Sequence, residues 1–387
     1  MKKKKVLLKL YSEFNLGDDL FLKIILERYP NVKFYLNADR RYKVVFKNKS
    51  NLSIFNSSKI VKLYNKGIWF LDKVLYPKDG QNSLVKYINA INKNYFNLTD
   101  IFVSIGGSIF MQEKLLPYYF DIEYYKQVNL FYKGKPKFYL GCNFGPFLDS
   151  TFKTEYECIF KKAIDVCFRE EYSKKLFENL NNVRHKPDIV FGLKINKAKK
   201  IDRSVGFSII SPRRNIDTNK YLQKYAELIS YYQANGYKIF LFSFCKKQGD
   251  EKTIKEIIKL LPKRDNINPV FYDGDIESFL KLYSSVEQGY CGRFHAMILS
   301  MLCNQTIYPV VYSDKMTNVL QDINYNGDVI LMDNFHHLEP EYLFKSISLN
   351  SYSITNQIIE AEEQFQILDN CLFETIGLNG NHPEVYH

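Results

Sequence analysis

The sequence predicts an α/β protein made of two doubly wound, Rossmann-like domains that face each other across a cleft. The chain has 387 residues, enough for about two domains of ~150 residues each. Short apolar runs alternate with helical patterns, as in parallel sheets, and the alternation starts afresh after a basic, polar segment at 186–200. We therefore expect an N-terminal domain over 1–195, a C-terminal domain over 196–355, and a last helix near 356–387 that packs back on the first domain.

Five runs in the first half have the composition of buried strands, whereas the pattern between 40 and 99 is mixed. The strands are predicted at KVLLKLY (5–11), VKFYLN (32–37), DIFVSIGG (100–107), PKFYLGCNFG (136–145) and IDVCFRE (164–170).

The second half contains five strand–helix units in order. Strands are predicted at SVGFSII (204–210), YKIFLFSF (237–244), NPVFY (268–272), EQGYC (287–291) and TIYPVVY (306–312). Helices are predicted at about 217–235, with Gly236 as its stop, near 250–261, near 275–285, and from Arg293 onward.

The strand order expected for this class brings basic residues together. In a 3-2-1-4-5 order, the loops after strands one, four and five of the second domain meet at the carboxyl edge of the sheet, where ligands bind. These loops carry Arg213, Arg214, Arg293, His295 and Lys315.

Such a cluster suits a small ligand with two negative groups. The helix start at 292–294 is expected to offer free N–H groups and a positive dipole end. Arginine binds carboxylate or phosphate through its planar fork, and His295 could donate a proton. The alternatives are a surface ion pair for Arg293 and a purely structural role for His295.

The net charge of +12 lies entirely in the first hundred residues, which hold 20 Lys and Arg against 8 Asp and Glu. Basic and aromatic residues interleave over 40–76, a composition that suits an anionic membrane, an acidic polymer or nucleic acid. Because no nucleic-acid-binding motif accompanies the charge, we expect no nucleic-acid partner. The alternative is a solvated basic face.

Other features exclude several classes of protein. No apolar run approaches the ~20 residues of a membrane span, and Lys9 interrupts an N-terminal apolar stretch too short for a signal peptide. The seven cysteines show neither a CxxC pair nor metal-ligand spacing. We expect a cytoplasmic protein with reduced core thiols, no metal and no cofactor.

Motifs spread from residue 15 to 315 resemble those of the polysaccharide pyruvyltransferase family. The stretch GRFHAMILSMLCNQTIYPVVYSDK (292–315) resembles its C-terminal signature of Arg-x-His, a small-residue helix, a strand and Tyr-x-x-Lys. The other matching motifs, in the family's order, are NLGDD (15–19), SIGGS (104–108), GCNFGPF (141–147), REEYS (169–173) and PDIVF (187–191). One departure is Ser108, where many members have a third glycine.

The resemblance implies a fold similar to two-domain, GT-B-like glycosyltransferases. It also implies transfer of a pyruvyl group from phosphoenolpyruvate to two hydroxyls of a sugar in a cell-surface polysaccharide, such as a capsule or exopolysaccharide, or in its lipid-linked precursor. The products are a cyclic ketal and phosphate. Together, the cluster and the matched motifs make the expected substrate-binding set Arg293, Lys315, Arg213, Arg214, Asn15, Gly17, Gly106, Gly107 and Asn143.

This chemistry needs a general acid and a general base. His295 is the candidate acid for the methylene carbon of the donor. Asp18 is the candidate base for the acceptor hydroxyl, the alternative being that it caps a helix beginning near Asp18 and Asp19. Glu170 is a further option as the base, with an ion pair to Arg169 as the alternative.

Two other functions remain open at this point. One is a nucleotide-sugar-dependent glycosyltransferase of the same architecture. The other is a non-catalytic protein that binds polysaccharide or membrane. The basic N-terminal segment also suggests peripheral contact with an anionic membrane, at the inner face where a lipid-linked acceptor would be found.

Overall fold

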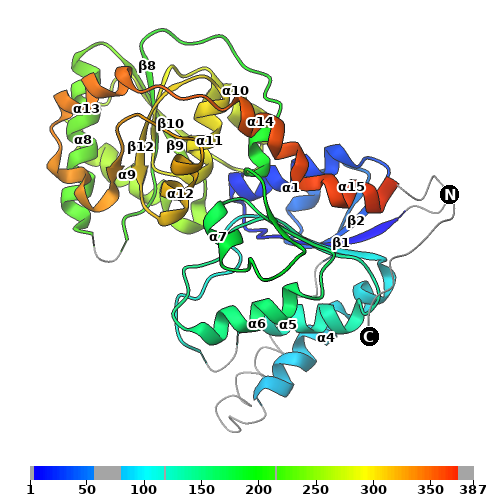
Figure 1. The fold of residues 1–387 in the computed structure, drawn as a ribbon. Helices are drawn as coiled ribbons and strands as arrows, with labels where there is room; N and C mark the ends of the chain where they lie inside the picture. Colours follow the sequence, from blue (N-terminus) through cyan, green and yellow to red (C-terminus); the bar gives the residue numbers. More distant parts are fainter. Residues whose placement is uncertain (1–3, 56–79, 117–118, 214–215, 374–387) are drawn as a thin grey trace.

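The computed structural model describes residues 4–55, 80–116, 119–213 and 216–373, which form two parallel α/β sheets (Figure 1). The first sheet has the order β3-β2-β1-β4-β5-β6-β7 and the second β10-β9-β8-β11-β12-β13. The second order is the predicted 3-2-1-4-5, extended by one strand, so that prediction is confirmed.

The first sheet is built from residues 5–185. Its strands are β1 (Lys5–Lys9), β2 (Lys33–Asn37), β3 (Leu52–Phe55), β4 (Ile101–Ile105), β5 (Lys137–Cys142), β6 (Asp165–Phe168) and β7 (Val183–His185). The helices between them are α1 (Leu16–Arg28), α2 (Tyr42–Val45), α4 (Gly80–Leu98), α5 (Phe120–Phe131), α6 (Ser150–Phe160) and α7 (Glu171–Lys175).

The second sheet is built from residues 204–331. Its strands are β8 (Ser204–Ser208), β9 (Lys238–Ser243), β10 (Ile267–Phe271), β11 (Gln288–Cys291), β12 (Thr306–Val311) and β13 (Ile330–Leu331). The helices are α8 (Thr218–Ala234), α9 (Asp250–Leu260), α10 (Ile276–Ser284), α11 (Phe294–Leu302) and α12 (Asp314–Asp322), with the short 3-10 turn η2 (Lys246–Gln248) before α9.

The segment after β7 joins the two sheets through the 3-10 turn η1 (Ile189–Gly192). After β13 the chain passes through η3 (Met332–His337), α13 (Pro340–Ser346), η4 (Ile347–Leu349), α14 (Thr355–Ala361), η5 (Glu362–Phe365) and α15 (Gln366–Phe373). Figure 1 shows α15 in red beside α1 in blue, on the face of the first sheet opposite α4, α5 and α6. Asp369 of α15 accepts hydrogen bonds from Arg28 and Tyr29, which ties this end of the described chain to α1.

Apolar side chains form three clusters that follow this layering. One fills the outer face of the first sheet under α4, α5 and α6 and is largely aromatic. Another lies between the second sheet and α8, α9 and α13. The third joins the inner faces of both sheets through α1, α10 and α11, so the two domains share one apolar core. This shared core fixes the two carboxyl edges opposite each other.

Cysteine placement differs in part from the prediction. Five of the seven cysteines are buried, but Cys158 is exposed and Cys371 is half-buried, so these two are not core thiols.

Candidate active site

A cavity of about 360 Å³ lies between the carboxyl edges of the two sheets. It is lined from the first domain by the loop after β1, the start of α1, the loop after β4 and Arg169 after β6, and from the second by the loops after β8, β9, β11 and β12. Six of the predicted site residues line it: Asn15, Asp18, Gly107, Arg293, His295 and Lys315. The sheet topology therefore brings both halves of the predicted site into one small cavity.

His295 lies on the first turn of α11 and meets the first domain at Gly17. A Cβ at Gly17 would overlap with Nδ1 of the imidazole, so this glycine is required by the close approach of the ring. The ring packs edge-on against Phe21 at 5.3 Å between centroids, and its Nε2 is 3.7 Å from Asp188 Oδ2. Burial lowers the pKa of His295, and Asp188 opposes this shift. Gly17 thus sets the position of His295, and it is not among the described residues that line the cavity.

Asp18 is buried, with 8% of its surface exposed. Burial raises the pKa of its carboxyl to about 7, helped by the adjacent Asp19 and opposed by Arg169 and Lys315. The alternative role as a helix cap is wrong, because Asn15 caps α1 by accepting from the Gly17 N–H. The carboxyl of Asp18 can therefore gain or lose a proton near neutral pH.

Arg169 is a central residue of the site that the sequence did not single out as a ligand. Its guanidinium is buried, pairs with Asp188 at 2.9 Å, donates to Asn143 Oδ1 at 2.6 Å, and lies 4.1 Å from the centroid of the Phe294 ring. Gly107 leaves room for it, since a Cβ there would come within 2.7 Å of Nη1. The REEYS motif pointed to Arg169, but only the fold shows that its partner is Asp188.

Glu170 lies away from this cluster. It accepts from Ser173 Oγ and from Asn318 Nδ2, so the alternative of an ion pair with Arg169 is wrong.

Lys315 is the most available cation of the cavity. Its Nζ donates to Ser108 Oγ at 3.2 Å across the domain boundary, and within the described part of the chain no carboxylate lies within 4 Å of it. It lies 5.1 Å from the centroid of the Tyr312 ring. Burial raises the pKa of Tyr312, but the cations Lys315, Arg293 and Arg169 outweigh it, and the pKa lies below its ordinary value. The lowered pKa of Tyr312 marks a positive electrostatic environment that would favour an anion.

The prediction that the whole guanidinium group of Arg293 is free to bind a ligand is wrong. Its Nε donates to Asp250 Oδ2 at 3.1 Å, its Nη2 also pairs with this carboxylate, and its Nη1 donates to Gln248. The expected free N–H at Gly292 is likewise occupied, by the carbonyl and hydroxyl of Ser208. Arg293 thus ties the cavity wall to α9 and leaves only the remaining edge of its guanidinium for a ligand.

The other predicted residues lie around this centre. Asn143 is buried and holds Arg169 instead of lining the cavity. Gly106 directly follows β4, and a Cβ at this position would lie 3.9 Å from Asp18 Oδ1. Arg213 is exposed and lies 5.6 Å from the centroid of the Tyr312 ring, at the rim, whereas Arg214 lies outside the described residues. Within the described ranges, no group of three or more His, Cys, Asp and Glu is arranged to hold a metal ion.

Comparison with known proteins decides the family. The family model of polysaccharide pyruvyl transferases matches residues 15–314, which include both halves of the cavity. The chain belongs to this family. A search by sequence against curated proteins finds no match for this transferase.

Solved structures show that the transferase has the fold of GT-B enzymes. A UDP-GlcNAc 2-epimerase from Methanocaldococcus jannaschii, in complex with UDP-GlcNAc and UDP, matches with a TM-score of 0.54 and 11% identity, covering 95% of this chain and 99% of its own. UDP-N-acetylglucosamine 2-epimerase from Rickettsia bellii gives a TM-score of 0.56 at 7% identity, with coverage of 97% and 96%. α,α-Trehalose 6-phosphate synthase from Burkholderia multivorans gives 0.50 at 9%, with 95% of each chain covered. The predicted two-domain, GT-B-like fold is confirmed.

Proposed function

We propose that this transferase moves the pyruvyl group of phosphoenolpyruvate onto two hydroxyls of a saccharide and releases phosphate. The observation that carries the proposal is Lys315, a cation with no nearby carboxylate in the described chain, in a small cavity that also holds His295 and Asp18. A volume of about 360 Å³ is at the small end of ligand pockets, which span roughly 300–1,000 Å³, and suits a three-carbon unit with one carboxylate and one phosphate.

The reaction conserves atoms and protons without a redox partner. A proton adds to the methylene carbon of the donor, and the first hydroxyl attacks the adjacent carbon. The bond to the phosphate oxygen breaks, and the second hydroxyl closes the ketal. Of the two hydroxyl protons, one accounts for the new methyl group and one leaves with phosphate. The protein must therefore supply an acid, a base and stabilisation of a leaving anion.

His295 is the proposed acid and Asp18 the proposed base. Burial keeps the pKa of His295 low, and an anionic donor beside it would raise that pKa and favour the charged imidazole. The pKa of Asp18, at about 7, matches a base that works near neutral pH. The two side chains enter the cavity from opposite domains, so acid and base can act on different faces of one donor.

The anions of the donor would be held by Lys315 together with the free edge of Arg293. Arg213 and Arg214 are proposed to contact the donor from the rim. Asn15, Gly17, Gly106, Gly107 and Asn143 are proposed to act indirectly, by shaping the walls that position Asp18, His295 and Arg169.

A nucleotide-sugar-dependent glycosyltransferase is the second candidate, because the Methanocaldococcus epimerase of similar fold was solved with UDP-GlcNAc and UDP. Calorimetric titration separates the two. We expect phosphoenolpyruvate to bind the wild type and to bind Lys315→Ala at least about tenfold more weakly, since a charge-assisted contact is lost. Binding of UDP but not phosphoenolpyruvate would favour the glycosyltransferase, and binding of neither would favour a non-catalytic role.

The cellular setting of the reaction is also part of the proposal. In the described chain, no helix is both long and apolar enough to cross a bilayer. We propose that the enzyme works in the cytoplasm, with its basic N-terminal segment in peripheral contact with anionic lipid, on an acceptor that is lipid-linked.

A further inference from the structure

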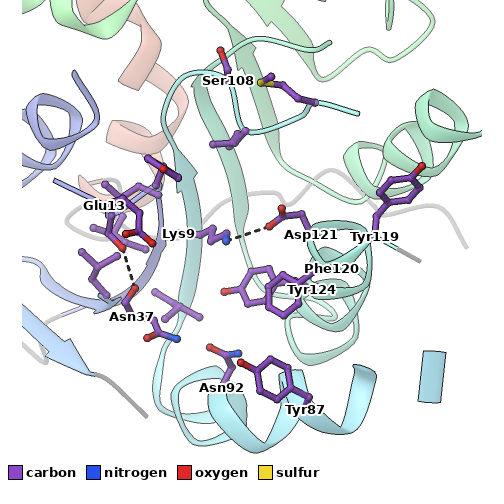
Figure 2. Close-up of a pocket in the computed structure, with 18 of the residues that line it drawn as sticks. Lys9, Glu13, Asn37, Tyr87, Asn92, Ser108, Tyr119, Phe120, Asp121 and Tyr124 are labelled. Atoms are coloured by element: carbon purple, nitrogen blue, oxygen red, sulfur yellow. Dashed lines mark hydrogen bonds and ion pairs between the residues drawn. The ribbon is translucent and has the colours of Figure 1, made fainter. Parts of the chain in front are cut away.

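A second, larger cavity adjoins the first and lies wholly within the N-terminal domain. Its volume is about 730 Å³, and its lining includes residues at the carboxyl ends of β1 and β2 and in the loop after β4. Figure 2 shows some of the side chains that line it. Both cavities are lined by Tyr11, Ser108, Ile109, Met111 and Glu113. A ligand that fills the larger cavity can therefore reach the reacting centre over this shared wall.

One side of the larger cavity is aromatic. Tyr87 of α4 lies edge-on to Phe120 of α5 at 6.2 Å, and Phe120 stacks with Tyr124 at 6.4 Å between centroids (Figure 2). Phe120 is 40% exposed, although it lines a cavity. A half-exposed phenylalanine beside two tyrosines offers the apolar face and the hydroxyl edge that a sugar ring needs.

Beside these rings, the described lining is polar and nearly balanced in charge. Lys9 and Asp121 form an ion pair at 3.2 Å, and Lys9 lies 5.2 Å from the centroid of the Tyr124 ring. Among the described residues, the charged lining side chains are Lys9, Lys114, Glu13, Glu113 and Asp121, and Glu13 also pairs with Lys247 at 2.9 Å. Counting Lys247, these described residues supply three cations and three carboxylates, so they offer no surplus positive charge to an anionic ligand, in contrast to the smaller cavity.

We infer that this cavity is the acceptor site and that it takes an uncharged pyranoside, with the ring on Phe120 and its hydroxyls on the Lys9–Asp121 pair. The inference rests on the proposed function, because the hydroxyls that point past Ser108 would be those that receive the pyruvyl group. Ser108 stands at the junction: its hydroxyl donates to Asn143 and accepts from Lys315. We expect a uronate or a sugar phosphate to bind more weakly, because Asp121, Glu13 and Glu113 offset the nearby cations.

Saturation-transfer NMR with simple sugars tests this inference separately from catalysis. The probes are methyl β-galactopyranoside, methyl α-mannopyranoside and methyl β-glucuronopyranoside. At least one neutral glycoside should show transfer from the wild type, and more than the glucuronide. Phe120→Ala and Asp121→Asn should weaken this signal about threefold or more, as expected for loss of one aromatic or charged contact.

The matched control is Leu130→Ala, which removes a 65% exposed side chain from the same helix outside the cavity and should leave the signal unchanged. Lys315→Ala should keep sugar binding while losing the thermal shift caused by phosphoenolpyruvate. Phe120→Ala should lose sugar binding while keeping that thermal shift. Absence of transfer to both neutral glycosides, a stronger signal from the glucuronide, or an unchanged signal in Phe120→Ala overturns the inference. Failure of phosphoenolpyruvate to shift the wild type, with sugar binding intact, overturns the proposed donor instead.

Discussion

At the scale of single residues, the proposed acid and the proposed base line the same cavity from opposite domains. His295 lies against Gly17 of the first domain, and Asp18 is the next residue of the same helix. Their pKa values are moved in opposite senses, downward for His295 and upward to about 7 for Asp18, mainly by the same cause, burial. Burial favours the neutral form of each side chain.

We expect His295→Ala to reduce phosphate release by about 100-fold or more, because it removes the proposed proton donor. The affinity for phosphoenolpyruvate, measured by calorimetry, should change far less, since Lys315 remains. Turnover close to that of the wild type would remove His295 from the mechanism.

The raised pKa of Asp18 also has a consequence for stability. In the unfolded chain the carboxyl ionises near its ordinary value of 3.8, and in the folded protein near 7. Between these values the folded state holds a proton that the unfolded state has lost, so stability falls as pH rises through this range. We expect Asp18→Asn to raise the melting temperature by about 2 °C or more at pH 8 relative to the wild type, and by less at pH 5.

Thermal unfolding followed by circular dichroism measures this difference. Asp202→Asn, at an exposed aspartate, is the control and should show no such dependence on pH. An equal effect of Asp18→Asn at both pH values would mean that Asp18 does not ionise near pH 7.

At the scale of secondary-structure elements, the sequence predicted the central strands of both sheets well and the edge strands poorly. The long apolar strands and their order were predicted because buried parallel strands are continuous apolar runs. The edge strands β3 (LSIF), β7 (VRH) and β13 (IL) were missed, because they are short and two of them are partly polar. The helix after β11 begins where it was expected, with Arg293 as its N-cap residue.

The same limit applies to the site. Residues at strand ends, such as His295 and Lys315, follow from topology. The pairing of Arg293 with Asp250, and of Arg169 with Asp188, depends on contacts between elements far apart in sequence, and no local pattern reveals them.

The contact between α1 and α11 can be tested through Gly17. Gly17→Ala would place a methyl group against His295 and displace the ring, so we expect phosphate release to fall strongly while the fold is kept. A double-mutant cycle with His295→Ala provides the control: if the methyl acts through the ring, adding Gly17→Ala to His295→Ala should cost little more. Additive losses would show that Gly17 acts independently of His295.

At the scale of the whole molecule, the two domains are held in register by buried contacts beside the site. Asp19 accepts hydrogen bonds from Tyr42 of the first domain at 2.6 Å and from Tyr272 of the second at 2.7 Å. Nearby, the Leu16 N–H donates to the Phe244 carbonyl. These contacts fix α1, which carries Asp18 immediately before Asp19, against the second domain, so the position of the proposed base relative to His295 depends on domain packing.

The excess positive charge of the first domain leads to a prediction about membranes. Lys43 and Lys47 are exposed, whereas Lys49 is paired with Glu27 at 2.8 Å. Attraction to anionic lipid amounts to roughly 1 kcal/mol for each basic residue near the surface and is screened by salt. We therefore expect flotation with anionic vesicles at low salt, loss of flotation at high salt, and weaker flotation of Lys43→Glu/Lys47→Glu.

Lys252→Glu/Lys263→Glu makes the same charge change at exposed lysines of the second domain and should float like the wild type. If the wild type does not float at low salt, or if both double variants lose flotation equally, the prediction of membrane contact is wrong and the basic segment is a solvated face.

The central claim, transfer of pyruvyl to form a ketal, is tested most directly by following the donor carbon itself. The wild-type enzyme is incubated with phosphoenolpyruvate labelled with ¹³C at the carbon that bears the phosphate, together with a panel of neutral saccharides, and the products are followed by NMR. The account predicts that the labelled carbon becomes a saturated ketal carbon bonded to two sugar oxygens, with one phosphate released for each ketal and neither formed by Lys315→Ala. Release of phosphate with the label recovered as free pyruvate, or no reaction with any saccharide while a nucleotide sugar is consumed, would contradict it.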